Sequence, residues 1–368
     1  MAKSNQPVKM SAKPSKSSKS TKAGKRTKSK PAVGLIGLGA MGMGVARNLR
    51  KHNFELYACD LNKAALKTAA GLGASTSTSP AQIAPHVDIL LILVVNADQT
   101  EAVLFGEHGA VNHLAPGAIV ITSSTMPPLY TEALDKRLQE RGLRLIDAPV
   151  SGGAVGANAG NMTIMAAGEP ATIKAAKPVF DAISGRVYQL GDTPGMGSKV
   201  KMINQLLAGV HIASATEAMA LGIRAGIDPQ ALFEVISNSA GSSWMFQNRV
   251  PHILDGDYTP LSAVDIFVKD LGIVLDSARQ MKFPLPLTAS AHQMFLATSA
   301  AGMGGEDDSA VIKMFERLTG IELPSGSGQS ARGQSARKNK STKKSGKKVT
   351  KKPVTANKPA TAKKARGK

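Results

Sequence analysis

The chain has 368 residues, with 46 Lys and Arg against 26 Asp and Glu, which gives a formal net charge of +20. This length suits two ordinary domains, and 42% apolar residues leave enough material for a hydrophobic core. The single cysteine, Cys59, excludes a disulfide framework within the chain and fits the reducing cytoplasm. The N-terminus lacks the apolar segment of a signal peptide, and the longest strongly apolar run, residues 89–95, is too short to cross a bilayer. We therefore expect a soluble cytoplasmic protein without a membrane span.

The positive charge lies at the two ends. Residues 1–31 contain ten Lys and Arg and residues 324–368 contain fifteen, and neither segment contains an acid. The remaining 21 basic and 26 acidic residues give 32–323 a net charge of about −5. Both ends consist mainly of Lys, Ser, Thr, Ala, Pro and Gly, so they are predicted to be disordered. Two interpretations stay open: non-specific binding of nucleic acid or another polyanion, and a solubilising extension.

The first predicted element is a short apolar strand that runs into the glycine turn of "VGLIGLGAMGMGVARNL". The turn has G-x-G-x-x-G spacing and opens a helix, and Asp60 follows its last glycine by eighteen residues at the end of the next strand. This context is typical of a dinucleotide site, with a diphosphate on the helix N-terminus and the acid on a ribose. Asp60 favours NAD over NADP because its charge repels a 2′-phosphate, although Lys63 leaves NADP open. A purely structural glycine turn is the alternative. The predicted cofactor contacts here are Gly37, Leu38, Gly39, Met41, Gly42 and Asp60.

Apolar runs at 89–95, 118–122 and 143–147 continue the alternation of strands and helices, which predicts a parallel sheet covered on both faces. Beyond residue 193 the strands stop, and one helix of about 28 residues is predicted up to Gly226. Further helices follow, with loops at "GDYTP" and "FPLPL". The predicted fold class is α/β: a Rossmann-type doubly wound sheet (32–193) joined by a long helix to an all-α domain (194–323), with disordered basic tails at 1–31 and 324–368.

Two lysines, Lys199 and Lys201, lie near the start of this long helix. They are about 200° apart around the helix axis, so they cannot share a face. Lys199 falls on a stripe of apolar residues, whereas Lys201 lies between Asn204 and Gln205. A partly buried lysine with a lowered pKa can take a proton from a hydroxyl, and the two amides could hold the lysine and a substrate oxygen. A lysine on the helix surface is the alternative.

A glycine-rich loop follows the strand at 143–147, in "DAPVSGGAVGANAGNMTIM". The hydroxyl of Ser151 and the amides of Gly152 and Gly153 could form an anion nest for a substrate carboxylate. The alternative is an ordinary flexible loop.

Four stretches in this order, "VGLIGLGAMGMGVARNL", "DAPVSGG", "GMGSKVKMINQLL" and "FVKDLG", resemble the β-hydroxyacid dehydrogenases, which include 3-hydroxyisobutyrate dehydrogenase and tartronate semialdehyde reductase. The resemblance covers about residues 32–323 and leaves the basic ends outside. It implies NAD-dependent oxidation of a small hydroxy acid, or the reverse reduction of a semialdehyde, with Lys201 as the catalytic general acid and base and Asn204 beside it. We also expect a homo-oligomer, either a dimer or a tetramer, and no metal.

The resemblance adds residues to both binding sites. Many relatives have proline at the position of Val95 and a second asparagine at that of Gln205, so the substrate-side hydrogen bonds cannot be transferred directly. Trp244 could line a cleft with Phe246, or both could belong to the core. The added cofactor contacts are Val95, Asn96, Ser124, Thr125 and Lys269, and the predicted substrate contacts are Ser151, Gly152, Gly153, Gln205 and Phe246.

Overall fold

The computed structural model describes residues 30–325, so the two predicted tails lie almost wholly outside the described residues. Strands and helices alternate along the first part of this range. The strands are β1 (Val33–Ile36), β2 (Leu56–Cys59), β3 (Ser75–Ser77), β4 (Ile89–Ile92), β5 (Ile119–Thr122), β6 (Arg144–Asp147), β7 (Val150–Ser151), β8 (Met162–Ala167) and β9 (Ser184–Gly191). The helices between them are α1 (Ala40–Lys51), α2 (Lys63–Gly71), α3 (Pro80–Ile83), the 3-10 turn η1 (Ala84–His86), α4 (Ala97–Phe105), α5 (Pro128–Gln139), α6 (Gly153–Ala159) and α7 (Pro170–Ile183).

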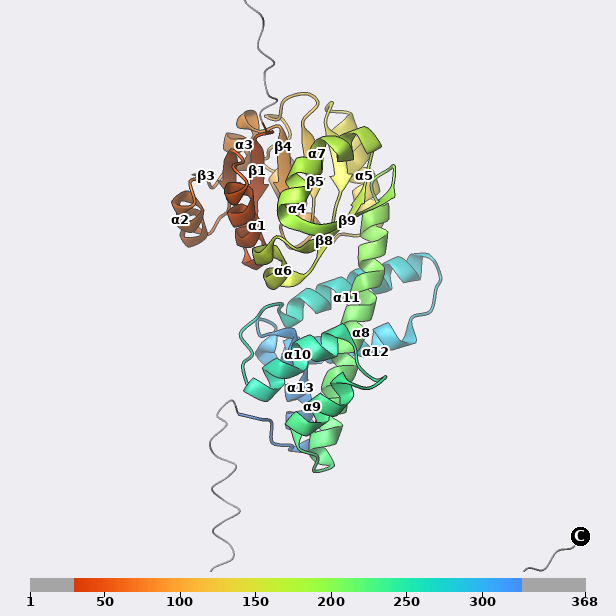
Figure 1. Ribbon diagram of the computed structural model, residues 1–368. Coiled ribbons are helices and arrows are strands. Elements are labelled where there is room, and N and C mark those ends of the chain that lie inside the picture. Colours follow the sequence, from red (N-terminus) through yellow and green to blue (C-terminus); the bar gives the residue numbers. More distant parts are fainter. Residues whose placement is uncertain (1–29, 326–368) are drawn as a thin grey trace, which may run out of the picture. The chain divides into compact units, whose positions relative to one another are not determined.

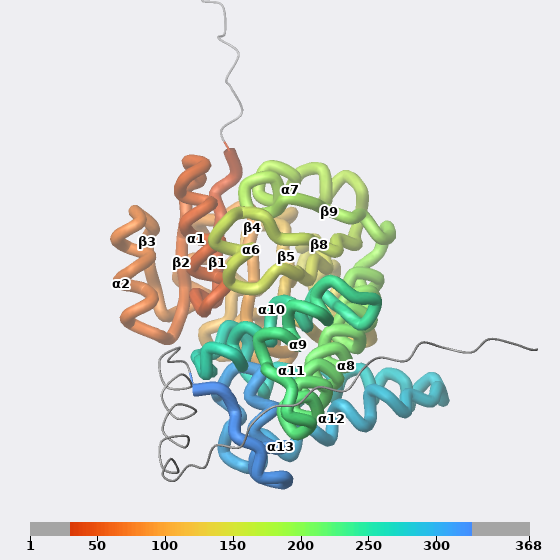
Figure 2. The backbone as a smooth tube through the Cα atoms, turned by 60° about the horizontal axis from the view of Figure 1, so that its bottom comes forward, coloured from red at the N-terminus to blue at the C-terminus, as the bar shows by residue number. Residues whose placement is uncertain are grey.

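The strands form one sheet, in which β3, β2, β1, β4, β5 and β6 are neighbours in that order and all parallel. The labels of β3, β2, β1, β4 and β5 follow one another across Figure 2. This order reverses direction between β1 and β4, as in Rossmann domains, and the reversal is where such sheets bind ligands at the carboxyl ends of their strands. The predicted doubly wound sheet is thereby confirmed.

The far edge of the sheet was not predicted. β8 is antiparallel to β6 and β7, and β9 is parallel to β8. Most residues of β9 are exposed, and its sequence, "SGRVYQLG", has neither an apolar run nor regular alternation. A strand of this kind depends on its hydrogen bonds to β8, which the sequence pattern does not reveal.

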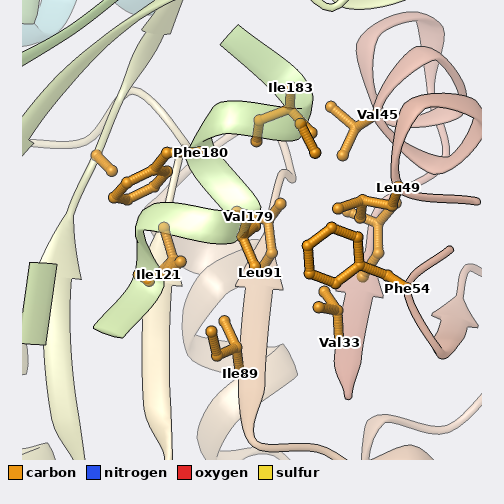
Figure 3. Close-up of a cluster of buried hydrophobic side chains, with 14 of the residues drawn as sticks. Val33, Val45, Leu49, Phe54, Ile89, Leu91, Ile121, Val179, Phe180 and Ile183 are labelled. Carbon is orange, nitrogen blue, oxygen red and sulfur yellow. The ribbon is translucent and has the colours of Figure 1, made fainter. Parts of the chain in front are cut away.

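Each face of the sheet has its own hydrophobic core, because successive side chains of a strand point to opposite faces. Ile89 and Leu91 of β4 belong to one cluster, whereas Leu90 and Ile92 belong to the other. Figure 3 shows the first cluster, where Ile89, Leu91 and Ile121 of the sheet face Val179 of α7. Helices therefore cover both faces, and the central strands are apolar on both sides.

After β9 the described chain is helical. The predicted long helix is confirmed as α8 (Met196–Arg224), which has 29 residues. It contacts β6 and β8 near its start and α10, α11 and α12 further along (Figure 1). The other elements are α9 (Pro229–Ser237), α10 (Trp244–Asp255), α11 (Val264–Gln280), α12 (Pro286–Thr298), the π-helical turn η2 (Ser299–Met303), the 3-10 turn η3 (Asp308–Val311) and α13 (Ile312–Thr319).

Within residues 30–325, α8 is the one helix that is long and apolar enough to cross a membrane when judged by length and composition alone. In this fold its buried residues pack against the helices around it. Its position as the central helix of the α-helical part therefore explains part of its apolar composition, whereas Ile203, Leu207 and Leu221 are exposed.

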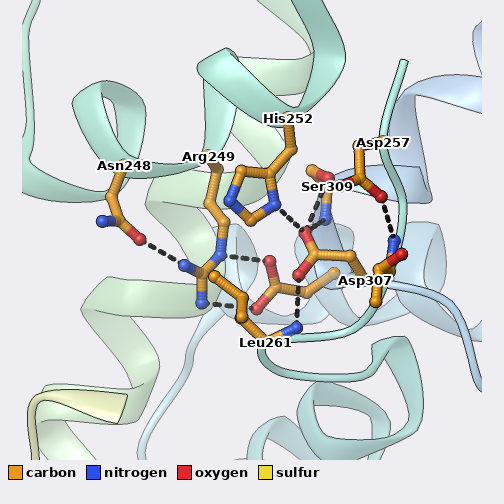
Figure 4. A network of polar contacts seen from close by, with 9 residues as sticks. Asn248, Arg249, His252, Asp257, Leu261, Asp307 and Ser309 are labelled. Atoms are coloured by element: carbon orange, nitrogen blue, oxygen red, sulfur yellow. Dashed lines mark hydrogen bonds and ion pairs between the residues drawn. The ribbon is translucent and has the colours of Figure 1, made fainter. Parts of the chain in front are cut away.

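A buried network of charged side chains joins α10 to η3 (Figure 4). Arg249 donates to both carboxylate oxygens of Asp308, at 2.5 and 3.1 Å. His252 lies 3.0 Å from Asp307, which also accepts hydrogen bonds from the amide and hydroxyl of Ser309. Burial raises the pKa of Asp308 to about 6 despite Arg249, whereas the bonds from His252 and Ser309 overcome burial and hold the pKa of Asp307 at about 2.

Replacing Arg249 with Leu should destabilise the protein by about 3–5 kcal/mol, because the buried carboxylate of Asp308 loses the charge that pairs with it. The free energy of unfolding in urea measures this loss. Arg279→Leu is the matched control, since Arg279 pairs with Asp276 while both side chains are largely exposed, and it should change stability little. Equal stability of the two variants would show that the buried pair is not needed.

Candidate functional site

The glycine loop after β1 is tight on one side and open on the other. A side chain at Gly37, where φ is +95°, would place its Cβ 2.4 Å from the carbonyl oxygen of Leu93. A Cβ at Gly42 would lie 1.9 Å from the carbonyl oxygen of Gly37. At Gly39, by contrast, a Cβ would meet nothing within 4 Å. Gly37 and Gly42 therefore close the turn, and Gly39 leaves its backbone open to a ligand.

The helix that follows this loop can receive an anion. Gly39 is the N-cap of α1 and, as a glycine, has no side chain to cap the helix, and the first turn contains no acidic residue. The first amides of a helix have no partner within the helix, and its dipole favours negative charge there. These residues fit the diphosphate of a dinucleotide. Of the other predicted loop contacts, Leu38 is buried and Met41 is partly buried.

Asp60 lies beside the loop, at the carboxyl end of β2. Its Oδ2 accepts a hydrogen bond from the amide of Leu38 at 2.6 Å, and its Oδ1 accepts one from the amide of Asn62 at 2.7 Å. An ionised carboxylate can accept about four hydrogen bonds, so both oxygens retain capacity for ribose hydroxyls. Asp60 can therefore hold the loop and a ribose at the same time.

The loops after β4 and β5 lie at the same edge, because parallel strands end on one side of a sheet. Asn96 caps α4 by accepting from the amide of Gln99 at 2.8 Å, and the amide of Val95 donates to the side chain of Gln99 at 2.8 Å. Ser124 is buried, with its hydroxyl 3.5 Å from that of Thr100. The loop backbone that should face the cofactor is thus held by side chains of α4.

Asp147, at the carboxyl end of β6, holds the start of α8. Its Oδ2 accepts hydrogen bonds from the amides of Gly195 and Ser198, at 2.9 and 2.7 Å, and its Oδ1 accepts one from the hydroxyl of Ser198 at 2.8 Å. Asp147 is fully buried, and burial raises its pKa to about 6 even though these bonds act to lower it. We had not predicted this role, although an acid directly after a buried strand was a visible signal.

Lys201 follows Ser198 by one turn of α8 and is buried, with 8% of its surface exposed. Burial lowers its pKa to about 8, while Asp270 acts to raise that pKa and Lys269 acts to lower it further.

Lys199 is on another face, where its exposed ammonium pairs with Glu132 at 2.8 Å. The separation of the two lysines predicted from helical phase is confirmed. The predicted packing stripe beside Lys199, formed by Met202, Ile203, Leu206 and Val210, is only partly buried, because Ile203 is 52% exposed.

A chain of hydrogen bonds runs from α8 to α11 next to Lys201. The side-chain amide of Asn204 donates to that of Gln205 at 2.9 Å, and Gln205 donates to Asp270 at 2.5 Å. Asp270 also accepts from Lys269 at 2.5 Å, and Lys269 lies 3.4 Å from the carbonyl oxygen of Thr125. The structure thus connects four of the predicted site residues. It adds Asp270, which is next to Lys269 in "FVKDLG" but which we had not singled out.

The predicted substrate loop lies at the junction of β7 and α6. Ser151 ends β7, Gly152 is the N-cap of α6, and Gly153 is its first residue. α6 packs against α1 so closely that a Cβ at Gly44 would lie 2.7 Å from the backbone of Ala157. The loop is therefore held next to the helix that follows the glycine turn.

Phe246 lies in the hydrophobic core of the helical part. It is 3% exposed and stacks on Phe233, with ring centroids 5.9 Å apart, whereas Trp244 is 65% exposed. The substrate contact of Phe246 stays a prediction. Among the residues that the structure describes, His, Cys, Asp and Glu form no group suited to a metal ion.

Comparisons with known proteins agree with this geometry. The sequence model of the NAD binding domain of 6-phosphogluconate dehydrogenase matches residues 32–191, and that of the NAD-binding region of NADP-dependent 3-hydroxyisobutyrate dehydrogenase matches residues 195–315. L-threonate dehydrogenase of Cupriavidus necator is 61% identical over 79% of this chain and 97% of its own. The Escherichia coli K12 enzyme of that name is 51% identical, over 79% and 96%.

A solved structure, 3-hydroxyisobutyrate dehydrogenase from Salmonella typhimurium, is 50% identical and has a TM-score of 0.74, over 77% of this chain and 99% of that one. These likenesses span both the sheet and the helical part, including the glycine loop and the helix that carries Lys201. The chain therefore belongs to the 3-hydroxyisobutyrate dehydrogenase family, NAD(P)-dependent oxidoreductases that act on CH–OH groups, and within it is similar to the L-threonate dehydrogenases.

Proposed function

We propose that this protein oxidises L-threonate at its C2 hydroxyl with NAD, giving 2-dehydro-L-erythronate. The observation that carries this proposal is a buried lysine, Lys201, whose pKa is lowered to about 8 and which lies one helical turn beyond the anchor of α8 on the sheet. The similarity to proteins named L-threonate dehydrogenase supports the choice of substrate.

Lys201 supplies the proton chemistry of this reaction. Its neutral amine takes the proton of the C2 hydroxyl as the C2 hydride leaves, so that the C–O single bond becomes a carbonyl. When bound, NAD provides the nicotinamide ring that accepts this hydride. Asn204 lies next to Lys201 on α8 and helps to orient the substrate, while Ser151, Gly152 and Gly153 bind its carboxylate.

The glycine loop and Asp60 provide the cofactor site. The open backbone at Gly39 and the first amides of α1 bind the diphosphate. Asp60 accepts hydrogen bonds from the ribose and repels a 2′-phosphate, so we propose NAD rather than NADP as the preferred cofactor. Val95, Asn96, Ser124, Thr125 and Lys269 complete the site.

Two other substrates are the alternatives within this family, namely 3-hydroxyisobutyrate and, in the reverse direction, tartronate semialdehyde. The same residues serve all three reactions. A panel of three- and four-carbon hydroxy acids, each with NAD and NADP and followed by nicotinamide absorbance, should show the highest kcat/KM for L-threonate with NAD.

Lys201→Met should lower the kcat for L-threonate oxidation by about 10²–10⁴-fold, because the proton acceptor is removed, and should leave NAD affinity nearly unchanged.

Lys199→Met is the matched control, since it removes an equal charge from the same helix at an exposed position. It should retain nearly all of the activity. Full turnover by Lys201→Met would contradict the assignment of the catalytic base.

The oxidation rate should depend on the protonation of Lys201. The amine accepts a proton only when neutral, so kcat/KM for oxidation should rise with pH and level off above about 8, the value to which burial lowers this pKa. The reverse reduction needs the ammonium form and should lose rate as pH rises through the same range. A pH profile in both directions tests this, and an oxidation rate that falls across this range would contradict it.

For the two basic ends we propose weak, non-specific binding of nucleic acid. They contain 25 of the 46 basic residues and lie almost wholly outside the described residues. DNA affinity should fall steeply with salt and be lost when 1–31 and 324–368 are deleted, while dehydrogenase activity is retained. Fluorescence anisotropy with labelled DNA measures this, and affinity that survives the deletion would place the binding surface in the folded part.

We also propose that the protein is a homo-oligomer, either a dimer or a tetramer. Val200, Ile203 and Leu207 lie on one side of α8 and are 36%, 52% and 50% exposed. Apolar side chains in such a row are suited to packing against a second copy. The molar mass from light scattering tests this, and a monomer would contradict it.

A further inference from the structure

Asp270 of α11 is a buried carboxylate. It is 2% exposed, and its two oxygens are used by different partners. Oδ1 accepts from the ammonium of Lys269 and Oδ2 accepts from the side-chain amide of Gln205, both at 2.5 Å. Both bonds are charge-assisted, a class of hydrogen bond about twice as strong as neutral ones.

An ionised carboxylate has only acceptors, so it determines which way its neighbours turn. Gln205 must point its Nε2 towards Asp270, and its Oε1 then lies on the opposite side. That oxygen accepts from Nδ2 of Asn204 at 2.9 Å. The amide of Asn204 is therefore fixed with its nitrogen towards Gln205 and its Oδ1 turned away. The oxygen and nitrogen ends of an amide look alike by shape, but here the charge of Asp270 fixes both amides.

We propose that Asp270 and Gln205 are positioning residues that orient Asn204 so that it presents an acceptor, Oδ1, to the substrate. This rests on the proposed function and gives Asn204 a specific role. Lys201 and Asn204 are three residues apart on α8, which places them on neighbouring positions of one face. An acceptor at this position takes a hydrogen bond from a substrate hydroxyl and repels a carboxylate. The geometry thus selects substrates with a hydroxyl at this point and directs their carboxylate elsewhere.

Gln205 itself had been predicted to bind the substrate. Its side chain is buried, with 8% of the residue exposed, and both ends of its amide already have partners on the protein. Its effect on the substrate therefore passes through Asn204. Many relatives have asparagine at this position, which is one methylene shorter than glutamine. The longer side chain of Gln205 therefore spans a greater distance between α8 and Asp270.

Asp270 has a second effect, through its charge. It acts to raise the pKa of Lys201, in opposition to burial and Lys269. Removing the charge should lower the Lys201 pKa further, whereas removing the amide link at Gln205 should not. The two variants Asp270→Asn and Gln205→Met therefore separate orientation from electrostatics.

The first measurement is steady-state kinetics with L-threonate and NAD over a range of pH. Gln205→Met should lower kcat/KM by roughly a hundredfold, the scale associated with misplaced reacting groups, and leave the pKa of the pH profile where it is in the unmodified protein. Asp270→Asn should lower kcat/KM similarly and also move that pKa downwards. Asp276→Asn, which removes an exposed carboxylate from the same helix, should change neither. Thermal unfolding and NAD affinity of all three confirm that each variant is folded.

The second measurement does not depend on turnover. Acetylation of Lys201 by acetic anhydride at graded pH, followed by peptide mass spectrometry, gives the pKa of this lysine directly in the intact protein. Asp270→Asn should lower it relative to the unmodified protein, and Gln205→Met should not. Unmodified protein that oxidises none of the hydroxy acids overturns the proposed function but leaves this comparison intact. Activity of Gln205→Met equal to that of the unmodified protein overturns the positioning role, and an unchanged Lys201 pKa in Asp270→Asn overturns the charge effect of Asp270.

Discussion

The bond between Asp147 and the first turn of α8 is the constraint on which the site depends. This carboxylate, at the end of β6, accepts hydrogen bonds from two backbone amides and one hydroxyl of residues 195–198, so the helix starts at a fixed point on the sheet. Lys201 and Asn204 follow within two turns of α8, so the anchored start of the helix determines where they lie. Burying this charge is unfavourable, as its raised pKa shows, and the donors around it offset the cost.

A second constraint is the balance of charges around Lys201. Burial alone moves this lysine towards neutrality, and the adjacent Asp270 and Lys269 act on it with opposite signs. These two charges also pair with each other, so their opposite effects on Lys201 largely cancel. The same pair orders the side-chain amides of Gln205 and Asn204. Lys201 can therefore have a pKa near neutrality without an unpaired charge beside it.

Local patterns in the sequence were enough to predict the parallel sheet, the glycine turn and α8. The spacing of Gly37, Gly39 and Gly42 between a strand and a helix predicted the turn. The helical period alone placed Lys199 and Lys201 on different faces. The roles of Asp147 and Asp270 were not predicted, because the residues that they hold in place, Ser198 and Gln205, lie 51 and 65 residues away in the chain. The edge strand β9 was missed for a similar reason, since its partner β8 and not its own composition defines it. For Phe246 the sequence left a cleft and the core open, and its side chain packs in the core against Phe233.

The close approach of α6 to α1 at Gly44 has a consequence for how the site could diversify. Even a single methyl group at this position would collide with the backbone of Ala157, and Asn48 ties the same segment to α1 through a 2.8 Å hydrogen bond to the carbonyl oxygen of Ala157. The glycine loop at the start of α6 is therefore tied closely to α1, the helix that follows the glycine turn. Residue 44 therefore acts as a spacer, because its size sets how closely α6 can approach α1.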